Sequence, residues 1–211
     1  MKLITSITLA MIASASAATL ASFTFDTDLS ATATDVTASD LSGGPGFSVI
    51  HSGTNAITTQ GQGLDTGDTS GIFGAISAGE YFTFTVTADA GESLDLTNLT
   101  GDFCLRGSGA QDFYFFSNVN GFNPSDAIAS YTGVPNGGSA FDIDLSGADY
   151  QGLSSITFRV VVDNRFTNTS VASDTGFQGI VLNGDVVTVP EPTSAALLGL
   201  GGLTLLARRK R

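Results

Sequence analysis

The stretch that decides the fold class is Tyr81-Phe82-Thr83-Phe84-Thr85-Val86-Thr87. Its apolar and polar side chains alternate strictly, and a period of two residues is typical of a β-strand with one buried face. Residues 156–162 and 141–145 follow the same alternation, and the second segment places Asp142 and Asp144 on one polar face. The pattern therefore predicts half-buried antiparallel strands.

Weaker strand candidates surround these three: residues 20–25, 47–50, 94–103, 113–118, 128–132 and 179–187. Turn-forming residues lie between them, at 43–46, 65–68, 107–109 and 135–138. Asn183-Gly184, set between two apolar runs, predicts a two-residue hairpin turn. Roughly eight to ten short strands predict an all-β fold, a jelly-roll-like antiparallel β-sandwich. A single-stranded β-helix is the main alternative, although no fixed-period repeat occurs.

The charges are distributed unevenly along the 211 residues. Twenty Asp and Glu face eight Lys and Arg, which gives a net charge of −12. All twenty acids lie between residues 18 and 192 with only Arg106, Arg159 and Arg165, so this body carries a formal charge of −17. Such a body does not suit nucleic acid, whose phosphates require clustered bases. An acidic body with basic ends is typical of an exported segment between two cytoplasm-facing termini.

The N-terminus has the three parts of a secretory signal peptide. Lys2 supplies the positive charge, residues 3–13 are largely apolar, and Ala15-Ser16-Ala17 is a small-residue cleavage site. We therefore expect signal peptidase to cut between Ala17 and Ala18, with a cut after Ala15 as a variant and an N-terminal core strand or helix as the alternative. Removal of residues 1–17 would leave the mature chain outside the cytoplasm.

The C-terminus combines three further elements. Val189-Pro190-Glu191-Pro192 is followed by an apolar run at residues 193–207 and then by Arg208-Arg209-Lys210-Arg211. The two prolines favour an extended, accessible link. As a helix the apolar run of 15 residues would be roughly 22 Å long, a marginal span of the hydrocarbon core of about 30 Å. The four terminal bases would hold its end at the cytoplasmic face.

These three elements closely resemble the PEP-CTERM protein-sorting signal of Gram-negative bacteria. The resemblance implies recognition by an exosortase, a membrane-embedded cysteine protease-transpeptidase, near Pro190-Glu191-Pro192. It also implies a precursor anchored in the inner membrane and then located at the cell surface or in the extracellular matrix, where polysaccharide would be a partner. A C-terminal anchor that is never cleaved is the alternative. The expected organisation is a signal peptide at 1–17, a β-sandwich at 18–188 and a sorting signal at 189–211.

The body offers few residues for catalysis. His51 is the only imidazole and no G-x-S-x-G nucleophile elbow occurs, so a surface histidine is expected there. The lone Cys104 lies in an apolar stretch and is expected to be a small buried residue. Glycoside hydrolysis needs a carboxylate pair with one raised pKa. Asp142 and Asp144 share a face, but alternating aspartates are more typical of a solvated surface. We therefore expect no enzyme.

Binding functions fit the body better. The main hypothesis is a structural or adhesive exported protein, with a carbohydrate-binding module as the alternative and an unrecognised hydrolase third. The absence of Trp disfavours sugar stacking, although four Tyr remain. No cofactor is expected, because the aspartates suit a solvated coat. If there is one, calcium fits best, since it prefers oxygen ligands in Asp-rich loops. Its candidate ligands are Asp26, Asp28, Asp65 and Asp68.

Overall fold

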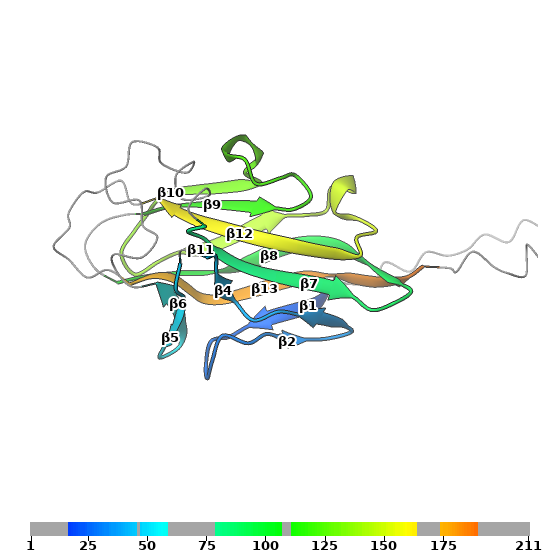
Figure 1. Ribbon diagram of the computed structural model, residues 1–211, viewed down its shortest axis with the longest axis horizontal. Helices are drawn as coiled ribbons and strands as arrows, with labels where there is room; N and C mark the ends of the chain where they lie inside the picture. Colours follow the sequence, from blue (N-terminus) through cyan, green and yellow to red (C-terminus); the bar gives the residue numbers. More distant parts are fainter. Residues whose placement is uncertain (1–16, 46, 59–78, 107–110, 164–173, 190–211) are drawn as a thin grey trace, which may run out of the picture.

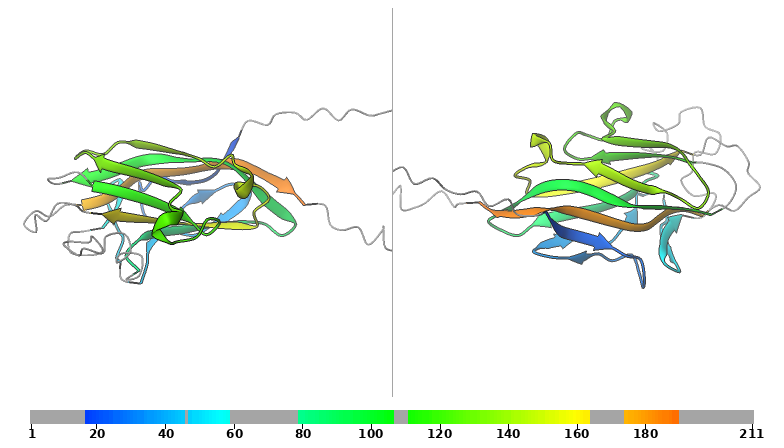
Figure 2. Two further views of the ribbon diagram at one scale, coloured as in Figure 1. Left: turned by 90° about the horizontal axis from the view of Figure 1, so that it is seen from above. Right: turned by 180° about the vertical axis from the view of Figure 1, so that it is seen from behind.

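The computed structural model describes residues 17–45, 47–58, 79–106, 111–163 and 174–189. These residues form two sheets packed face to face (Figures 1 and 2). Every strand pair among them is antiparallel. The predicted β-sandwich is therefore confirmed, and the β-helix alternative is wrong. Residues 1–16 of the signal peptide expected at 1–17, the sorting signal from residue 190, and the predicted turns at 65–68 and 107–109 lie outside the described residues.

Each sheet collects strands from distant parts of the chain. Sheet A contains β1 (Ala18–Phe23), β2 (Thr32–Ala33), β5 (Ile50–Ser52), β6 (Asn55–Thr58), β8 (Glu92–Arg106), β11 (Ala140–Asp144) and β13 (Asp174–Thr188). Sheet B contains β3 (Val36–Ala38), β4 (Ser42–Gly43), β7 (Phe82–Ala88), β9 (Gln111–Ser117), β10 (Ala129–Val134) and β12 (Ser155–Asp163). Two short 3-10 helices, η1 (Pro124–Asp126) and η2 (Ala148–Tyr150), lie in connections.

The strand order explains which segments become neighbours. Sheet A runs β11-β8-β13-β1-β2, with β6 also on β13 and β5 on β6, and sheet B runs β10-β9-β12-β7-β3, with β4 on β7. From β7 onward the chain changes sheet at every connection except β9–β10. Ala18 of β1 pairs with Gly184 of β13, so the described chain begins and ends at the same end of the sandwich (Figures 1 and 2).

The core fills the space between the sheets, as the alternation predicted. Phe82, Phe84 and Val86 of β7 are at most 2 % exposed, while the threonines between them face outward. Phe158 on β12 packs against Phe84, with ring centroids 5.1 Å apart. Burial of these aromatic side chains is the main force that holds the two sheets together.

The predicted hairpin at Asn183-Gly184 is wrong. β13 continues through both residues and pairs with β8 from Asp174 to Thr188. Asn183 pairs with Asn98 and Gly184 with Leu96, so Thr97 is an extra residue in a β-bulge. Gly184 is required by space: a Cβ there would lie 2.5 Å from the Asp95 carbonyl oxygen. A bulge, like a turn, can require glycine, and the dipeptide alone does not distinguish them.

Several element boundaries also differ from the prediction. Residues 47–49 are not in a strand, and the hydrogen-bonded segment there begins at Ile50. The short strands β2 to β6 and the two 3-10 helices were not fully anticipated, because two to four residues are too few to show a period. The turn predicted at 135–138 does connect β10 to β11, with the Gly138 N–H donating to the Pro135 carbonyl at 2.9 Å.

Candidate functional site

The predicted processing residues flank the sandwich directly. Ala17 and Ala18 are exposed, and Ala18 is the first residue of β1. At the other end, Thr188 closes β13 and the Val189 N–H donates to the Gly91 carbonyl at 2.8 Å. The motif residues Pro190, Glu191 and Pro192 and the basic tail Arg208, Arg209, Lys210 and Arg211 lie outside the described residues. Only Val189 therefore separates the last strand from the motif.

The calcium candidates do not come together in the part of the chain that can be described. Asp26 and Asp28 are exposed, and Asp28 accepts hydrogen bonds from the hydroxyl and backbone N–H of Ser30 at 2.5 and 2.9 Å. These bonds, the hydroxyl first, lower the pKa of Asp28. Asp65 and Asp68 lie outside the described residues. Among those described, no three His, Cys, Asp or Glu side chains are grouped to hold a metal. Calcium binding stays a prediction.

The two residues considered for nucleophilic catalysis take the expected structural positions. His51 is exposed on β5, and its Nε2 lies 2.9 Å from the carbonyl oxygen of Phe25. Cys104 is 2 % exposed within β8. The histidine thus contacts the backbone at the sheet edge and the cysteine is packed inside.

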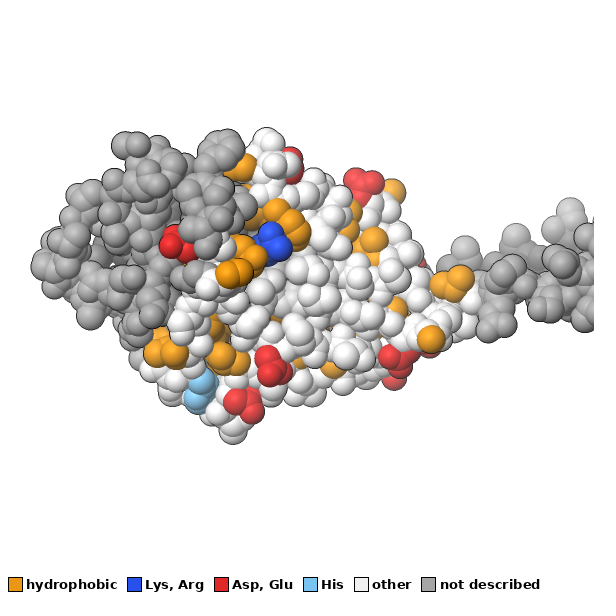
Figure 3. All heavy atoms as spheres, viewed as in Figure 1, with side chains coloured by type: hydrophobic (Ala, Val, Ile, Leu, Met, Phe, Trp, Pro, Cys, Tyr) orange, Lys and Arg blue, Asp and Glu red, His pale blue; other side chains and the backbone are white. Residues whose placement is uncertain are grey.

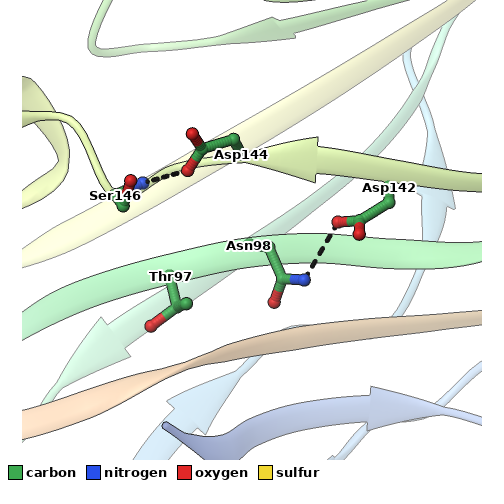
Figure 4. Close-up of a pocket in the computed structure, with 5 residues that line it drawn as sticks. All are labelled: Thr97, Asn98, Asp142, Asp144 and Ser146. Atoms are coloured by element: carbon green, nitrogen blue, oxygen red, sulfur yellow. Dashed lines mark hydrogen bonds between the residues drawn. The ribbon is translucent and has the colours of Figure 1, made fainter.

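A shallow hollow lies on the outer face of sheet A. Its volume is about 390 Å³, and its lining residues are Thr97, Asn98, Asp142, Asp144 and Ser146 (Figure 4). Asp142 and Asp144 are both exposed on β11, which confirms the polar face predicted for them. The hollow therefore lies where β8 and β11 run side by side and where the η2 connection begins.

The β-bulge in β8 gives the hollow its shape. Strict alternation would turn Thr97 and Asn98 to opposite faces of the sheet. Because Thr97 is the extra residue between the pairs Asn98–Asn183 and Leu96–Gly184, the side chains of both line the same hollow. The bulge thus concentrates polar groups that a regular strand would have separated.

A chain of side-chain hydrogen bonds, here called the polar ladder, crosses four neighbouring strands of sheet A. Thr19 Oγ1 on β1 donates to Asn183 Oδ1 on β13 at 3.1 Å, and Asn183 Nδ2 donates to Asn98 Oδ1 on β8 at 3.0 Å. Asn98 Nδ2 then donates to Asp142 Oδ1 on β11 at 2.9 Å (Figure 4). Each amide is oriented by its neighbours, so the ladder fixes the polar wall of the hollow before any ligand arrives.

The two carboxylates of the hollow are held as hydrogen-bond acceptors. Ser146, through its side chain and its backbone N–H, lowers the pKa of Asp144. Tyr131 donates its hydroxyl to the Asp142 carbonyl at 2.8 Å and accepts from the Asp142 N–H at 3.1 Å, which fixes the strand that carries both aspartates. A carboxylate with a lowered pKa is ionised at neutral pH, so it suits ligand hydroxyl groups better than proton donation.

The sequence revealed only part of this site. It placed Asp142 and Asp144 on a polar face, but it did not identify Thr97, Asn98, Asn183, Thr19 or Ser146. The one available signal was Asn183-Gly184. Its local sequence favours a turn, and nothing near it indicates that this segment pairs with β8 and forms a bulge there instead.

Removal of the central amide of the polar ladder tests its contribution to stability. Asn98→Ala deletes one accepted and one donated hydrogen bond. Because the bond to Asp142 is exposed and the bond from Asn183 only partly buried, we expect a loss of about 1 kcal/mol in the free energy of unfolding. Urea denaturation of the full-length chain measures it. Thr100→Ala, two residues along the same strand and outside the ladder, is the matched control and should change stability by less than about 0.5 kcal/mol. Equal losses in both variants would contradict a role for the ladder.

One comparison with known families concerns the C-terminal segment. The model for the PEP-CTERM protein-sorting motif matches residues 188–211. The chain carries a PEP-CTERM sorting signal. The resemblance inferred from the sequence is confirmed, and the PEP-CTERM signal implies an exported protein that is anchored transiently in the membrane and sorted by an exosortase. No curated protein matches this sequence.

The segment that would cross the membrane is not described. Within the described ranges, no helix combines the length and the apolar character needed to span a bilayer. The apolar run at 193–207, for which a marginal transmembrane helix was predicted, lies inside the PEP-CTERM signal and outside those ranges.

Two solved structures are similar to the chain at low identity. One is the K1 cleaved adhesin domain of Lys-gingipain from Porphyromonas gingivalis W83, with 14 % identity, a TM-score of 0.35, and coverage of 78 % of this chain and 97 % of that chain. The other is TmCBM61 in complex with β-1,4-galactotriose, with 12 % identity, a TM-score of 0.19, and coverage of 72 % and 85 %. Such low TM-scores carry no argument about function, and the β-sandwich rests on the strand pairing alone.

Proposed function

We propose that this protein is displayed at the cell surface or in the extracellular matrix, where the acidic sandwich has a structural or adhesive role without catalysis. The observation that carries the proposal is the junction between the sandwich and the sorting signal. β13 ends at Thr188 and the matched motif begins at that residue. The processed end of the chain would therefore be the end of a central strand of sheet A.

The pairing of β13 suits a protein that bears load at that end. β13 pairs with β8 at fourteen positions between Asp174 and Thr188, and it also pairs with β1 and β6. A pull applied along a strand loads these inter-strand hydrogen bonds together rather than one after another. An adhesive or matrix protein attached through β13 would thus resist extraction of the strand.

The chemistry of the described polar groups supports a role without catalysis. Asp144 has a lowered pKa, whereas a glycosidic acid requires a raised one. His51 lies against a backbone carbonyl, and Cys104 is buried. The positions of His51 and Cys104 are therefore accounted for by contacts within the protein, and neither requires a substrate.

A carbohydrate-binding module is the second candidate, and the hollow on sheet A favours it. Its carboxylate, amide and hydroxyl groups lie on neighbouring strands and are oriented by the polar ladder. Sugar hydroxyls are donors that such acceptor-rich surfaces can bind. Glycan-array binding of the full-length chain separates the two candidates: binding lost in Asp142→Asn supports the module, and no binding supports a structural role.

The proposed display is tested by the ends of the protein recovered from the cell surface and the medium. We expect a chain that begins near Ala18 and ends near Pro192, because both proteases would have acted. Intact mass and N-terminal sequencing measure both ends. A variant with alanine at 190, 191 and 192 should retain Arg211 and stay with the membrane. If the unaltered protein also retained Arg211 in the inner membrane, exosortase processing and display would both be wrong.

A further inference from the structure

The outer face of sheet B carries a feature that the hollow on sheet A does not explain. Arg159 projects from β12, where the register places it beside Thr83 on β7 and Phe116 on β9. Tyr81, Phe116 and Val161 form a separate buried apolar cluster on this face, and Tyr114, Phe122 and Ala127 pack against it. Figure 3, viewed as Figure 1, shows basic side-chain atoms among apolar ones at the position of β12. A cation thus lies within an apolar surface.

Two aromatic rings enclose this cation. The guanidinium carbon of Arg159 lies 4.4 Å from the centre of the Tyr81 ring and 3.9 Å from that of Phe122. Cation–π contacts of this kind contribute about 0.5–2 kcal/mol each. Because the N–H groups of a guanidinium point outward in its plane, a further ligand with hydrogen-bond acceptors would bind along its edge rather than on the side that the rings contact.

The hydrogen bonds of Arg159 are incomplete. Its Nε is buried and has no hydrogen-bond partner. An unsatisfied buried donor costs about 1–3 kcal/mol, and more when it belongs to a charged group. The body as a whole carries twenty acids, yet the described contacts of this cation are the two aromatic rings. An arginine placed in this way gains from an external anion at its terminal nitrogens.

We propose that Arg159, Tyr81 and Phe122 form a binding site for a carboxylated sugar, a uronic acid unit of an acidic polysaccharide. A carboxylate matches the edge of a guanidinium, because the N–H groups form a planar fork that binds both oxygens. The proposal rests on the proposed display outside the cell, where such a polymer is accessible, and it names a ligand for that surface.

The surroundings of Arg159 favour a ring-shaped ligand over an acidic peptide. The apolar cluster extends along β12 and β9 through Val161, Phe116 and Tyr114, next to the guanidinium. Phe116 and Val161 are buried, but Tyr114 and Phe122 at the edge of the cluster are only partly so. The C–H face of a sugar ring can pack on these two aromatic side chains while its carboxylate reaches Arg159. A glutamate side chain would supply the carboxylate but no ring to pack on them. Since the protein is acidic, each contact should be weak, and a repeating polymer would add many of them.

The test uses the full-length chain in a mild detergent and two matched probes, trigalacturonate and its methyl ester. The rings are the same, and only the acid offers carboxylates. We expect the acid to bind at least about tenfold more tightly than the ester by calorimetric titration, with Tyr81 and Phe122 ring signals shifting in NMR spectra. Arg159→Met should weaken binding by about tenfold or more. Arg159→Lys should retain part of it, because an ammonium keeps the charge without the fork.

Control variants and a control ligand separate uronate binding at Arg159 from binding elsewhere on the protein. Val187→Ala on sheet A, where the side chain is 41 % exposed and belongs to neither the hollow nor the aromatic cluster, should leave trigalacturonate binding unchanged, and circular dichroism establishes that each variant is folded. Equal affinity for acid and ester, or full binding by Arg159→Met, would overturn the proposal. If triglutamate bound as tightly as trigalacturonate, the assignment of a sugar as the ligand would be wrong, and an acidic protein partner would be indicated. If the protein is processed and displayed but does not bind uronate, only this site is refuted. If it binds uronate but is retained at the inner membrane, only the proposed display is refuted.

Discussion

Phe103→Ala is expected to reduce the free energy of unfolding by about 3–5 kcal/mol, the largest effect of a single core substitution that we predict. Phe103 on β8 is 1 % exposed. Its ring contacts five others, at centroid distances from 4.1 to 6.1 Å: Phe113, Phe115, Tyr131, Phe141 and Phe177. These rings come from both sheets, so the cavity left by alanine would lie between the layers, where neighbouring strands cannot close it without breaking their hydrogen bonds.

Chemical denaturation of the full-length chain, monitored by circular dichroism, measures this loss. Domains of this size are stable by only about 5–15 kcal/mol, so the variant should unfold at a much lower denaturant concentration. Phe103→Leu, which removes less volume, should cost clearly less and still fold. Val187→Ala is the control, because Val187 is 41 % exposed and should lose less than about 0.5 kcal/mol. A loss near the control value for Phe103→Ala would mean that the aromatic cluster is not the centre of the core.

The fold followed from the sequence wherever one face of a strand is buried. β7, β11 and most of β12 alternate, the exception being Val161 of β12, which is buried in the apolar cluster on the outer face. The pattern predicted the three strands to within one or two residues. The short strands could not be predicted in this way. β2, β3 and β4 have two or three residues, and they are strands only because β1 and β7 supply hydrogen-bond partners.

The candidate sites were harder to predict because they depend on pairing between distant residues. Asn98 and Asn183 are 85 positions apart, and Thr19 and Asn183 are 164 apart. Neither local propensity nor alternation predicts the register in which β8, β13 and β1 pair. The same holds for Arg159: alternation placed it on the outer face of β12, but nothing local indicated that Tyr81 and Phe122 would enclose it.

The wrong hairpin at Asn183-Gly184 shows how pairing decides the outcome. A type I′ turn needs positive φ at both central residues. Neither Asn183 nor Gly184 has a positive φ, whereas other described residues such as Asp35 and Gly53 do. β8 offers fourteen pairing positions to one continuous strand, and a turn at 183 would forfeit those beyond it. The glycine is retained for a different reason, close approach of two backbones at the bulge.

Gly184→Ala should therefore destabilise the protein by about 1–3 kcal/mol, as overpacking of a close-packed site does. The added Cβ would lie 2.5 Å from the Asp95 carbonyl oxygen and 3.0 Å from Leu20 Cδ1. The carbonyl is backbone within the paired β8, so relief requires the two strands to separate at the bulge. That shift would also move Asn98 and Asn183, and so disturb the polar ladder that lines the hollow.

Two measurements on the full-length chain test this coupling of fold and site. Denaturation gives the stability, and NMR signals of the Asn98 and Asn183 side-chain amides report the ladder. The matched control is Gly147→Ala, where φ is −63° and no atom lies within 4 Å of the added Cβ. That variant should be neutral or stabilised by up to about 1 kcal/mol, because alanine restricts the unfolded chain. If both variants behaved alike, the bulge would not be tightly packed, and the hollow would owe its shape to something other than the requirement for glycine at 184.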